Sequence, residues 1–142
     1  MAVYVLIHGA FHGGWCWRDV AAGLRARGHV VFTPTLTGLG AKSHLLTPDV
    51  DLDVHIQDVI NLMHWEDLTD VRLVGHSYGG MVVTGVADRA ADRIADIIYL
   101  DAIVPANGQS TLDVQPPGRA DWMRARAVEN GGVTIPPVEP EV

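Results

Sequence analysis

The chain of 142 residues is 48% hydrophobic and 19% charged, so it is expected to bury a core and to form one compact domain. Ten Lys and Arg against 17 Asp and Glu give a formal charge of −7, which argues against a nucleic-acid-binding surface. The only cysteine is Cys16, and no Cys/His cluster has the spacing of a structural zinc site. Disulfide and zinc-finger scaffolds are therefore excluded, and no metal site is expected.

The N-terminal apolar run, residues 2–7, is too short for a membrane span and has no basic leader of the kind found in signal peptides. It stops at a glycine-rich segment, residues 8–14. This pattern predicts a buried strand followed by a loop. We therefore expect a cytoplasmic protein without a membrane partner.

An amphipathic helix and a short strand are predicted next. Apolar residues recur at helical spacing from Trp17 to Leu24, and Gly28 supplies a stop signal. Residues 29–33 are rich in β-branched side chains and are followed by a proline, which predicts a second strand. The loop predicted over residues 34–48 is long for a compact domain, and loops of this length are often functional.

Two further helix and strand pairs follow along the chain. Helical spacing of apolar residues predicts one helix over residues 53–65 and another that begins near Met81. Strands are predicted over residues 71–74 and 95–100. Because strands alternate with helices, the connections are crossovers, and we predict an α/β fold with a parallel sheet covered by helices on both faces.

The last third of the chain differs in composition. Residues 105–142 hold six of the eight prolines and only one predicted helix, at about residues 120–128. We expect residues 1–107 to form the core of the fold. Residues 108–142 are expected to begin a cap over the sheet.

The sharpest motif is Gly75-His76-Ser77-Tyr78-Gly79, a G-x-S-x-G pattern between a predicted strand and a predicted helix. A serine on such a turn has a strained backbone that only small neighbouring residues tolerate. Its hydroxyl lies at the N-terminus of the helix, where backbone N–H groups stabilise developing negative charge. Ser77 is therefore the candidate nucleophile, and the alternative is a glycine-rich turn with an incidental serine.

The glycine-rich loop after the first strand offers the second half of such a site. Acyl transfer needs two N–H donors that converge on an oxyanion, and the amides of Ala10 and Tyr78 are placed for this role. His8 and His12 are four residues apart, but a loop does not put them on one helical face, so we reject a metal site there.

The other histidines and the first two tryptophans are given structural interpretations. We interpret His44, His55 and His64 as loop or helix-surface residues. Trp15 and Trp17 are interpreted as core anchors of the first helix, although Trp15 is close enough to the glycine-rich loop to line a pocket.

Taken together, four segments resemble the α/β-hydrolase superfamily, and more narrowly its plant-esterase and hydroxynitrile-lyase-like branch with many bacterial relatives. The segments lie at residues 5–17, 34–45, 73–80 and 99–105, and they include VLIHGAFHGGWCW, PTLTGLG, LVGHSYGG and YLDAIVP. They occur in the order of the family and are distributed over most of the stretch from residue 1 to residue 105.

The resemblance implies that Ser77 is the nucleophile and that the Ala10 and Tyr78 amides form the oxyanion hole. His76 would support the turn without acting as the base. In the family the acid and the histidine follow later strands, whereas no histidine follows His76 in this sequence. We therefore expect the N-terminal part of the fold with its C-terminal strands missing, an incomplete triad, and an inactive chain when alone. Asp101 could supply the acid, but we favour a pocket-wall or loop-capping role.

The function that we expect is hydrolysis of a small carboxylic ester or lactone through an acyl-enzyme, without a cofactor. The expected pocket residues are Phe11, His12, Trp15, Asp101 and Trp122. A hydroxynitrile-lyase-like C–C cleavage is the alternative, but that branch carries a threonine where this chain has Gly9.

A third hypothesis is a truncated fragment that acts in binding or assembly. A parallel sheet without its later strands exposes an apolar edge, which favours pairing with another segment. The partner would be a C-terminal fragment or a second copy of the chain.

Overall fold

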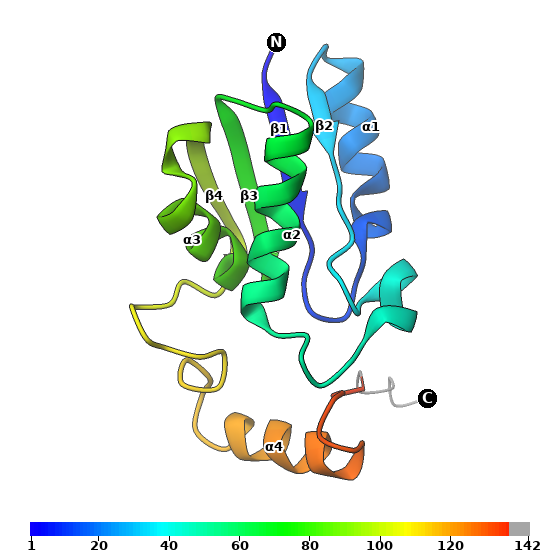
Figure 1. Ribbon diagram of the computed structural model, residues 1–142, viewed down its shortest axis with the longest axis vertical. Helices are drawn as coiled ribbons and strands as arrows, with labels where there is room; N and C mark the ends of the chain where they lie inside the picture. Colours follow the sequence, from blue (N-terminus) through cyan, green and yellow to red (C-terminus); the bar gives the residue numbers. More distant parts are fainter. Residues whose placement is uncertain (137–142) are drawn as a thin grey trace.

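A four-stranded parallel sheet forms the centre of the molecule (Figure 1). The computed structural model describes residues 1–136, and its strands stand in the order β2-β1-β3-β4. All three neighbouring pairs are parallel, which confirms the predicted fold class. The strands are β1 (Val3–Ile7), β2 (Val30–Phe32), β3 (Val71–Ser77) and β4 (Ile94–Ala102).

Helices cover both faces of this sheet, as the alternation of elements predicts. The 3₁₀ helix η1 (Gly14–Trp17) leads into α1 (Arg18–Ala26) on one face. The opposite face is covered by α2 (Leu52–Trp65) and α3 (Gly79–Arg89). Within residues 1–136, no helix has the length and apolar character needed to cross a membrane.

The central strands are buried on both sides. Successive side chains of β1 point to opposite faces, so Val5 and Ile7 pack with α2 and α3, while Leu6 packs with the α1 face. Leu73 and Val74 of β3 divide between the two cores in the same way. This burial explains the continuous apolar runs in the sequence, because a strand covered on both faces has no polar side.

The predicted elements are present with small shifts at their ends. β3 continues to Ser77 because its pairing with β4 continues as far as Ala102. The prediction that residues 34–48 form only a loop is wrong in part, since the 3₁₀ helix η2 (Gly40–Leu45) lies within them. Such short helices carry no amphipathic repeat that a sequence pattern could reveal.

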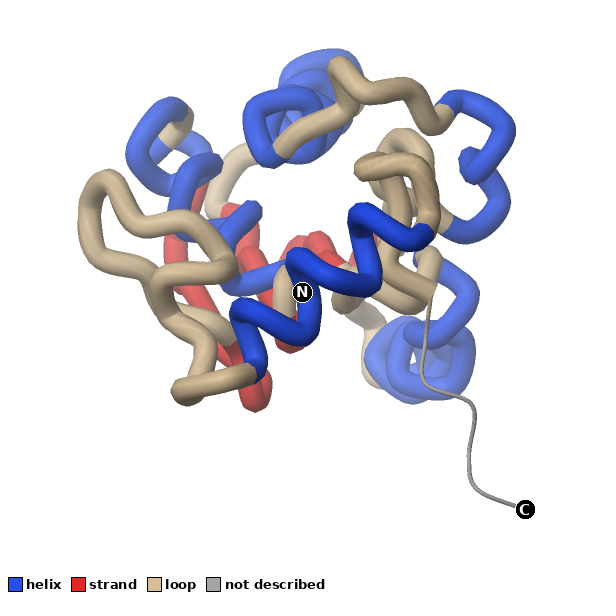
Figure 2. Tube along the Cα trace, turned by 90° about the horizontal axis from the view of Figure 1, so that it is seen from below, coloured by secondary structure: helices blue, strands red, loops and turns tan. Residues whose placement is uncertain are grey.

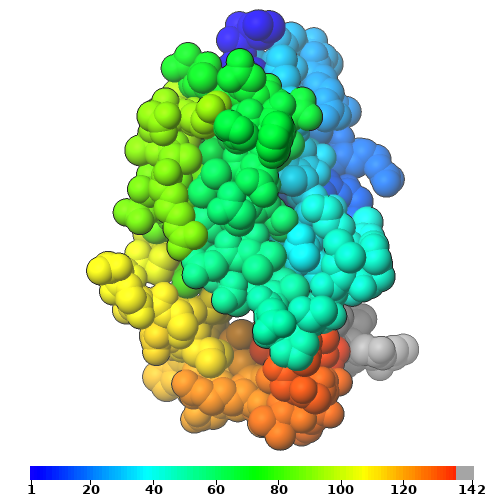
Figure 3. Space-filling model, viewed as in Figure 1, coloured from blue at the N-terminus to red at the C-terminus, as the bar shows by residue number. Residues whose placement is uncertain are grey.

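The chain after β4 passes below the carboxyl ends of the strands (Figure 1). Here α4 (Arg119–Glu129) lies across those ends when the molecule is seen from below (Figure 2). In the space-filling view its orange and red surface closes the lower end of the molecule (Figure 3). Residues 137–142, the end of the predicted cap segment, lie outside the described residues.

β4 is an edge strand of the sheet that residues 1–136 form. Seven of its nine residues are exposed, and the exposed apolar ones are Ile97, Ile98, Tyr99 and Leu100. An open, apolar edge of this kind is a surface on which a further strand can pair.

Candidate active site

Ser77 occupies a strained turn between β3 and α3. Its φ is +53°, in the left-handed region that costs a residue with a Cβ roughly 1–2 kcal/mol. Two residues later, α3 begins at Gly79, with Tyr78 as its N-cap. The serine therefore stands at the N-terminal end of a helix, as the G-x-S-x-G motif predicts.

The glycines around Ser77 allow neighbouring backbones to approach closely. A Cβ on Gly79 would lie 2.7 Å from the carbonyl oxygen of Ile7, and a Cβ on Gly80 would lie 2.0 Å from that of Ile103. The Ile103 N–H also donates to the Ser77 carbonyl oxygen at 3.0 Å. The turn is thus held between the end of β1 and the segment that follows β4.

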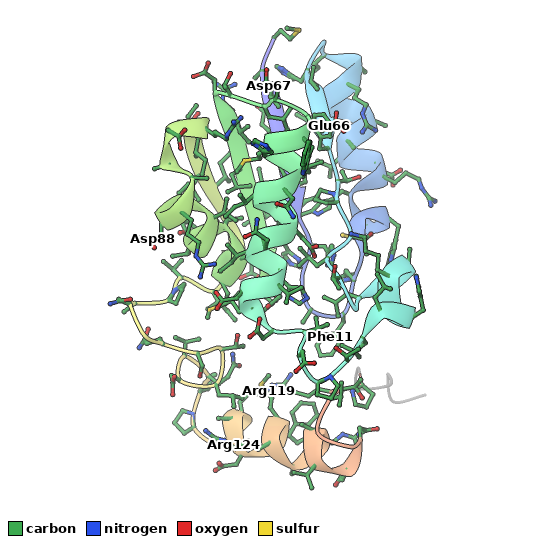
Figure 4. The ribbon with its side chains drawn as sticks, viewed as in Figure 1. Phe11, Glu66, Asp67, Asp88, Arg119 and Arg124 are labelled. Atoms are coloured by element: carbon green, nitrogen blue, oxygen red, sulfur yellow. The ribbon has the colours of Figure 1, made fainter. Side chains whose placement is uncertain are left out.

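Ser77 opens into a cavity of about 600 Å³ between the carboxyl ends of the strands and α4. Among the expected site residues, those that line this cavity are Ala10, Phe11, His12, Trp15, Ser77, Tyr78 and Trp122. Phe11 comes from the loop after β1, and Arg119, which also lines the cavity, comes from the first turn of α4 (Figure 4). The Arg119 guanidinium lies over the Trp122 ring, 4.2 Å from its centroid. The cavity wall therefore combines aromatic and aliphatic side chains with one cation.

One expected pocket residue, Asp101, lies elsewhere, and one of the two tryptophans interpreted as core anchors lines the cavity instead. Asp101 is exposed near the end of β4 and does not line the cavity. Trp15 is 56% exposed at the cavity, whereas Trp17 is only 6% exposed and packs in the α1 core. The interpretation of both tryptophans as core anchors is therefore wrong for Trp15, because η1 directs only Trp17 toward the sheet.

The interpretation of His55 as a surface residue is also wrong. His55 is 7% exposed, and its ring joins Tyr78 to the loop before η2 through two hydrogen bonds. The sequence held a signal for this burial, because Leu52, Ile56 and Val59 share the same face of α2 at helical spacing. His44 and His64 are exposed, as expected.

His8 is fully buried directly after β1. Its Nε2 accepts a hydrogen bond from the Leu36 N–H at 3.1 Å, so Nδ1 carries the proton and donates to the Gly9 carbonyl oxygen at 2.8 Å. That carbonyl and the Ala10 N–H belong to one planar peptide unit. The imidazole therefore also fixes the direction of the Ala10 N–H.

Burial lowers the pKa of His8 by more than its bond to Gly9 raises it, and the charges of His12 and His55 lower it further. The neutral form is also the form that the hydrogen bonds require, because a proton on Nε2 would oppose the Leu36 N–H.

A serine hydroxyl that acts as a nucleophile needs a base. His8 and His55 use both ring nitrogens elsewhere. The ring of His76 stands 6.1 Å from that of His12 and 6.3 Å from that of Trp17, measured between centroids.

Among the described residues, no group of three or more His, Cys, Asp or Glu is arranged to hold a metal ion.

The comparisons with known proteins agree on one family. The model of the alpha/beta hydrolase family matches residues 4–139. A carbendazim hydrolyzing esterase from Nocardioides sp. (strain SG-4G) is 57% identical over 116 residues, which is 82% of this chain and 48% of the relative. Methylesterase 10 from Arabidopsis thaliana is 33% identical over 105 residues, which is 72% of this chain and 38% of the relative.

A solved extracellular alpha/beta-hydrolase from a Paenibacillus species superposes with a TM-score of 0.87 at 33% identity, covering 96% of this chain and 56% of that one. The chain spans less than half the length of the two curated relatives named above.

We predict that Ser77→Gly is more stable than Ser77→Ala by about 0.5–1 kcal/mol, because both lose the hydroxyl but only alanine keeps a Cβ at a positive φ. Denaturant unfolding of the two variants measures this difference. As a control, Ser110→Gly should gain nothing over Ser110→Ala, since φ is not positive at this exposed position. An alanine variant at position 77 as stable as the glycine variant would contradict the strain.

We also predict that His8 makes stability depend on pH. Its pKa is lowered in the folded state from an unfolded value of about 6.5, so the unfolded state binds the proton first. Its contribution is fully present above pH 6.5 and is lost as the pH falls toward the folded pKa, with a slope of up to about 1.4 kcal/mol per pH unit.

Thermal unfolding between pH 7.5 and 5.5 tests this dependence. His8→Gln should flatten the slope, although it lowers stability at every pH, and His64→Gln, at an exposed histidine, should leave the slope unchanged. An unchanged slope in His8→Gln would show that another group titrates.

Proposed function

The chain belongs to the alpha/beta hydrolase family, and from this premise we propose that it carries the nucleophile of a serine ester hydrolase. The proposed reaction is cleavage of a small carboxylic ester or lactone through an acyl-enzyme. The observation that carries the proposal is Ser77, held at a positive φ before α3 and facing the cavity.

In the proposed mechanism the Ser77 oxygen attacks the ester carbonyl, and its proton passes to a base. The Ala10 and Tyr78 amides donate to the oxyanion of the tetrahedral intermediate. The alcohol leaves, and water then attacks the acyl-enzyme to release the acid and restore the serine. The His8 bond to Gly9 supports this assignment because it orients the Ala10 peptide.

We propose that the base is an imidazole outside these 142 residues. The proposal is supported by the share of its relatives that the chain spans and by the engagement of His8 and His55 in other hydrogen bonds. A serine without its imidazole retains only the small rate that the oxyanion hole and binding provide. The chain by itself is therefore proposed to be inactive.

The cavity supports a small, mainly apolar substrate. Its volume of about 600 Å³ and its walls of Phe11, Trp15 and Trp122 suit a compact ester with an aromatic or aliphatic group. Residues 108–142 are proposed to begin a cap, which would supply the Trp122 side of this cavity. The carbendazim hydrolyzing esterase among the relatives is in keeping with ester cleavage.

We predict that Ser77→Ala in the complete protein that carries this sequence lowers the hydrolysis of nitrophenyl esters on the order of 10⁴-fold or more, because the attacking oxygen is removed. Steady-state rates and labelling by a fluorophosphonate measure this loss. Ser110→Ala, an exposed serine that does not line the cavity, should retain both activities.

Three outcomes would change the proposal. Unchanged hydrolysis by Ser77→Ala would remove the nucleophile, and cleavage of mandelonitrile without ester turnover would favour the lyase. Ser77-dependent hydrolysis by the 142-residue chain alone would show that the chain contains its own base.

The exposed edge of β4 favours a second candidate role in assembly. Its row of unpaired backbone groups and its apolar side chains, Ile97 to Leu100, can accept a further strand. The occupant that we propose is a C-terminal segment of the same fold, because the relatives are longer than this chain.

We predict that the 142-residue chain alone self-associates, whereas Ile98→Lys weakens this association by placing a charge on the edge. Light scattering after size exclusion measures the mass of each species. Val20→Lys, which places the same charge at an exposed apolar position of α1 away from β4, is the control. A monomer at all concentrations with cooperative unfolding would contradict the assembly role.

A further inference from the structure

His55 joins the nucleophile turn to the loop before η2. Its Nε2 lies 2.8 Å from the Thr37 carbonyl oxygen, and its Nδ1 lies 2.8 Å from the Tyr78 hydroxyl. A carbonyl oxygen only accepts, so Nε2–H donates to Thr37. In the neutral imidazole Nδ1 then accepts, and the Tyr78 O–H donates to it.

Tyr78 is the residue on which this contact acts. Its backbone N–H directly follows Ser77 and is the second donor of the proposed oxyanion hole. Burial raises the pKa of its hydroxyl, so the hydroxyl keeps the proton that it donates to His55. The two rings also meet edge to face, with centroids 5.7 Å apart. The ring contact and the hydrogen bond therefore both hold Tyr78, the residue whose amide must be fixed for the oxyanion hole.

Thr37, at the other end of this link, is also held by several hydrogen bonds. Asp58, on the same helix as His55, accepts hydrogen bonds from the Thr37 N–H at 2.6 Å and from the Thr37 hydroxyl at 2.9 Å. Three hydrogen bonds thus join Thr37 to α2. The residues that follow Thr37, Gly38 and Leu39, line the cavity.

The same loop reaches the first oxyanion donor through His8. Leu36 donates to His8, and His8 donates to the Gly9 carbonyl whose peptide carries the Ala10 N–H. Two adjacent loop residues, Leu36 and Thr37, therefore connect through two buried imidazoles to the two proposed donors. These two imidazoles, of His8 and His55, are the only buried polar or charged side chains among the described residues.

We propose that His55 is a positioning residue for ester hydrolysis: by joining the Tyr78 hydroxyl to the Thr37 carbonyl, it fixes the Tyr78 amide relative to the Ala10 amide. The inference rests on the proposed function, because it concerns the oxyanion hole of that reaction. His55 does not touch the substrate cavity itself, so its effect on the reaction passes through Tyr78. Displacing an oxyanion donor weakens the stabilisation of the transition state more than it weakens substrate binding.

The test uses Tyr78→Phe and His55→Gln in the complete protein that carries this sequence. Tyr78→Phe keeps the ring and the amide but removes the donor to Nδ1. In His55→Gln the amide nitrogen can still donate to Thr37, but the ring nitrogen Nδ1 is lost and the amide oxygen, bonded to the same carbon as the amide nitrogen, does not take its place. Removal of a whole oxyanion donor costs about 10²- to 10³-fold in kcat, so we expect each variant to lose about 10-fold, with KM changed less than about twofold.

A double variant separates the link from two independent effects. Because the substitutions break the same bond, Tyr78→Phe combined with His55→Gln should lower kcat no further than the single variants do. NMR relaxation should show a more mobile amide at residue 78 in the complete protein carrying either substitution. His64→Gln, an exposed histidine on the same helix, should change neither kcat nor this amide.

The outcomes distinguish the inference from the function on which it rests. Hydrolysis that survives Ser77→Ala would contradict the proposed function. In an enzyme that depends on Ser77, unchanged kcat in Tyr78→Phe and His55→Gln would overturn only the positioning role. A fall in kcat with an unchanged amide at residue 78, or additive losses in the double variant, would overturn it as well.

Discussion

The close passage of the chain from β3 into α3 is the constraint on which the site depends. The backbone at Gly79 lies so near the end of β1 that a Cβ there would meet the Ile7 carbonyl oxygen at 2.7 Å, and a Cβ on Gly80 would meet the Ile103 carbonyl oxygen at 2.0 Å. This packing forces Ser77 to a φ of +53°. The strained backbone holds Ser77 at the carboxyl end of β3, where it lines the cavity. The packing of the surrounding core must supply the free energy that offsets this strain.

Around this turn, the molecule uses buried polar side chains sparingly. His8 and His55 are the buried polar or charged side chains in the described part of the chain, and both have hydrogen-bond partners on each ring nitrogen. A buried imidazole without such partners would cost free energy, because its polar atoms lose water. Their placement connects the strand-end loops to one another. The core of apolar side chains supplies stability. The hydrogen bonds of these two histidines hold the Gly9 carbonyl and the Tyr78 hydroxyl beside Ser77.

The cavity beside Ser77 and the open edge at β4 differ in how they expose apolar side chains to solvent. The cavity beside Ser77 has walls from the strand-end loops and from α4, and these walls suit the apolar substrate that we propose. The edge at β4 leaves apolar side chains in water, although a parallel strand is ordinarily covered on both faces. The first surface fits the chemistry of an ester hydrolase, and the second fits a further segment that completes the sheet.

The sequence by itself determined the fold class, the order of the elements and the strained turn at Ser77, because these follow from local periodicity and from glycines at fixed spacing. Only the tertiary structure decided that His55 is buried, that Trp15 faces the cavity, and that Asp101 lies away from it. Each depends on which surfaces meet: a residue at the margin of a helix face is buried or exposed according to the loop packed against it. His55 meets Thr37 and Tyr78, which are 18 and 23 residues away in the sequence, and no local pattern encodes such a contact.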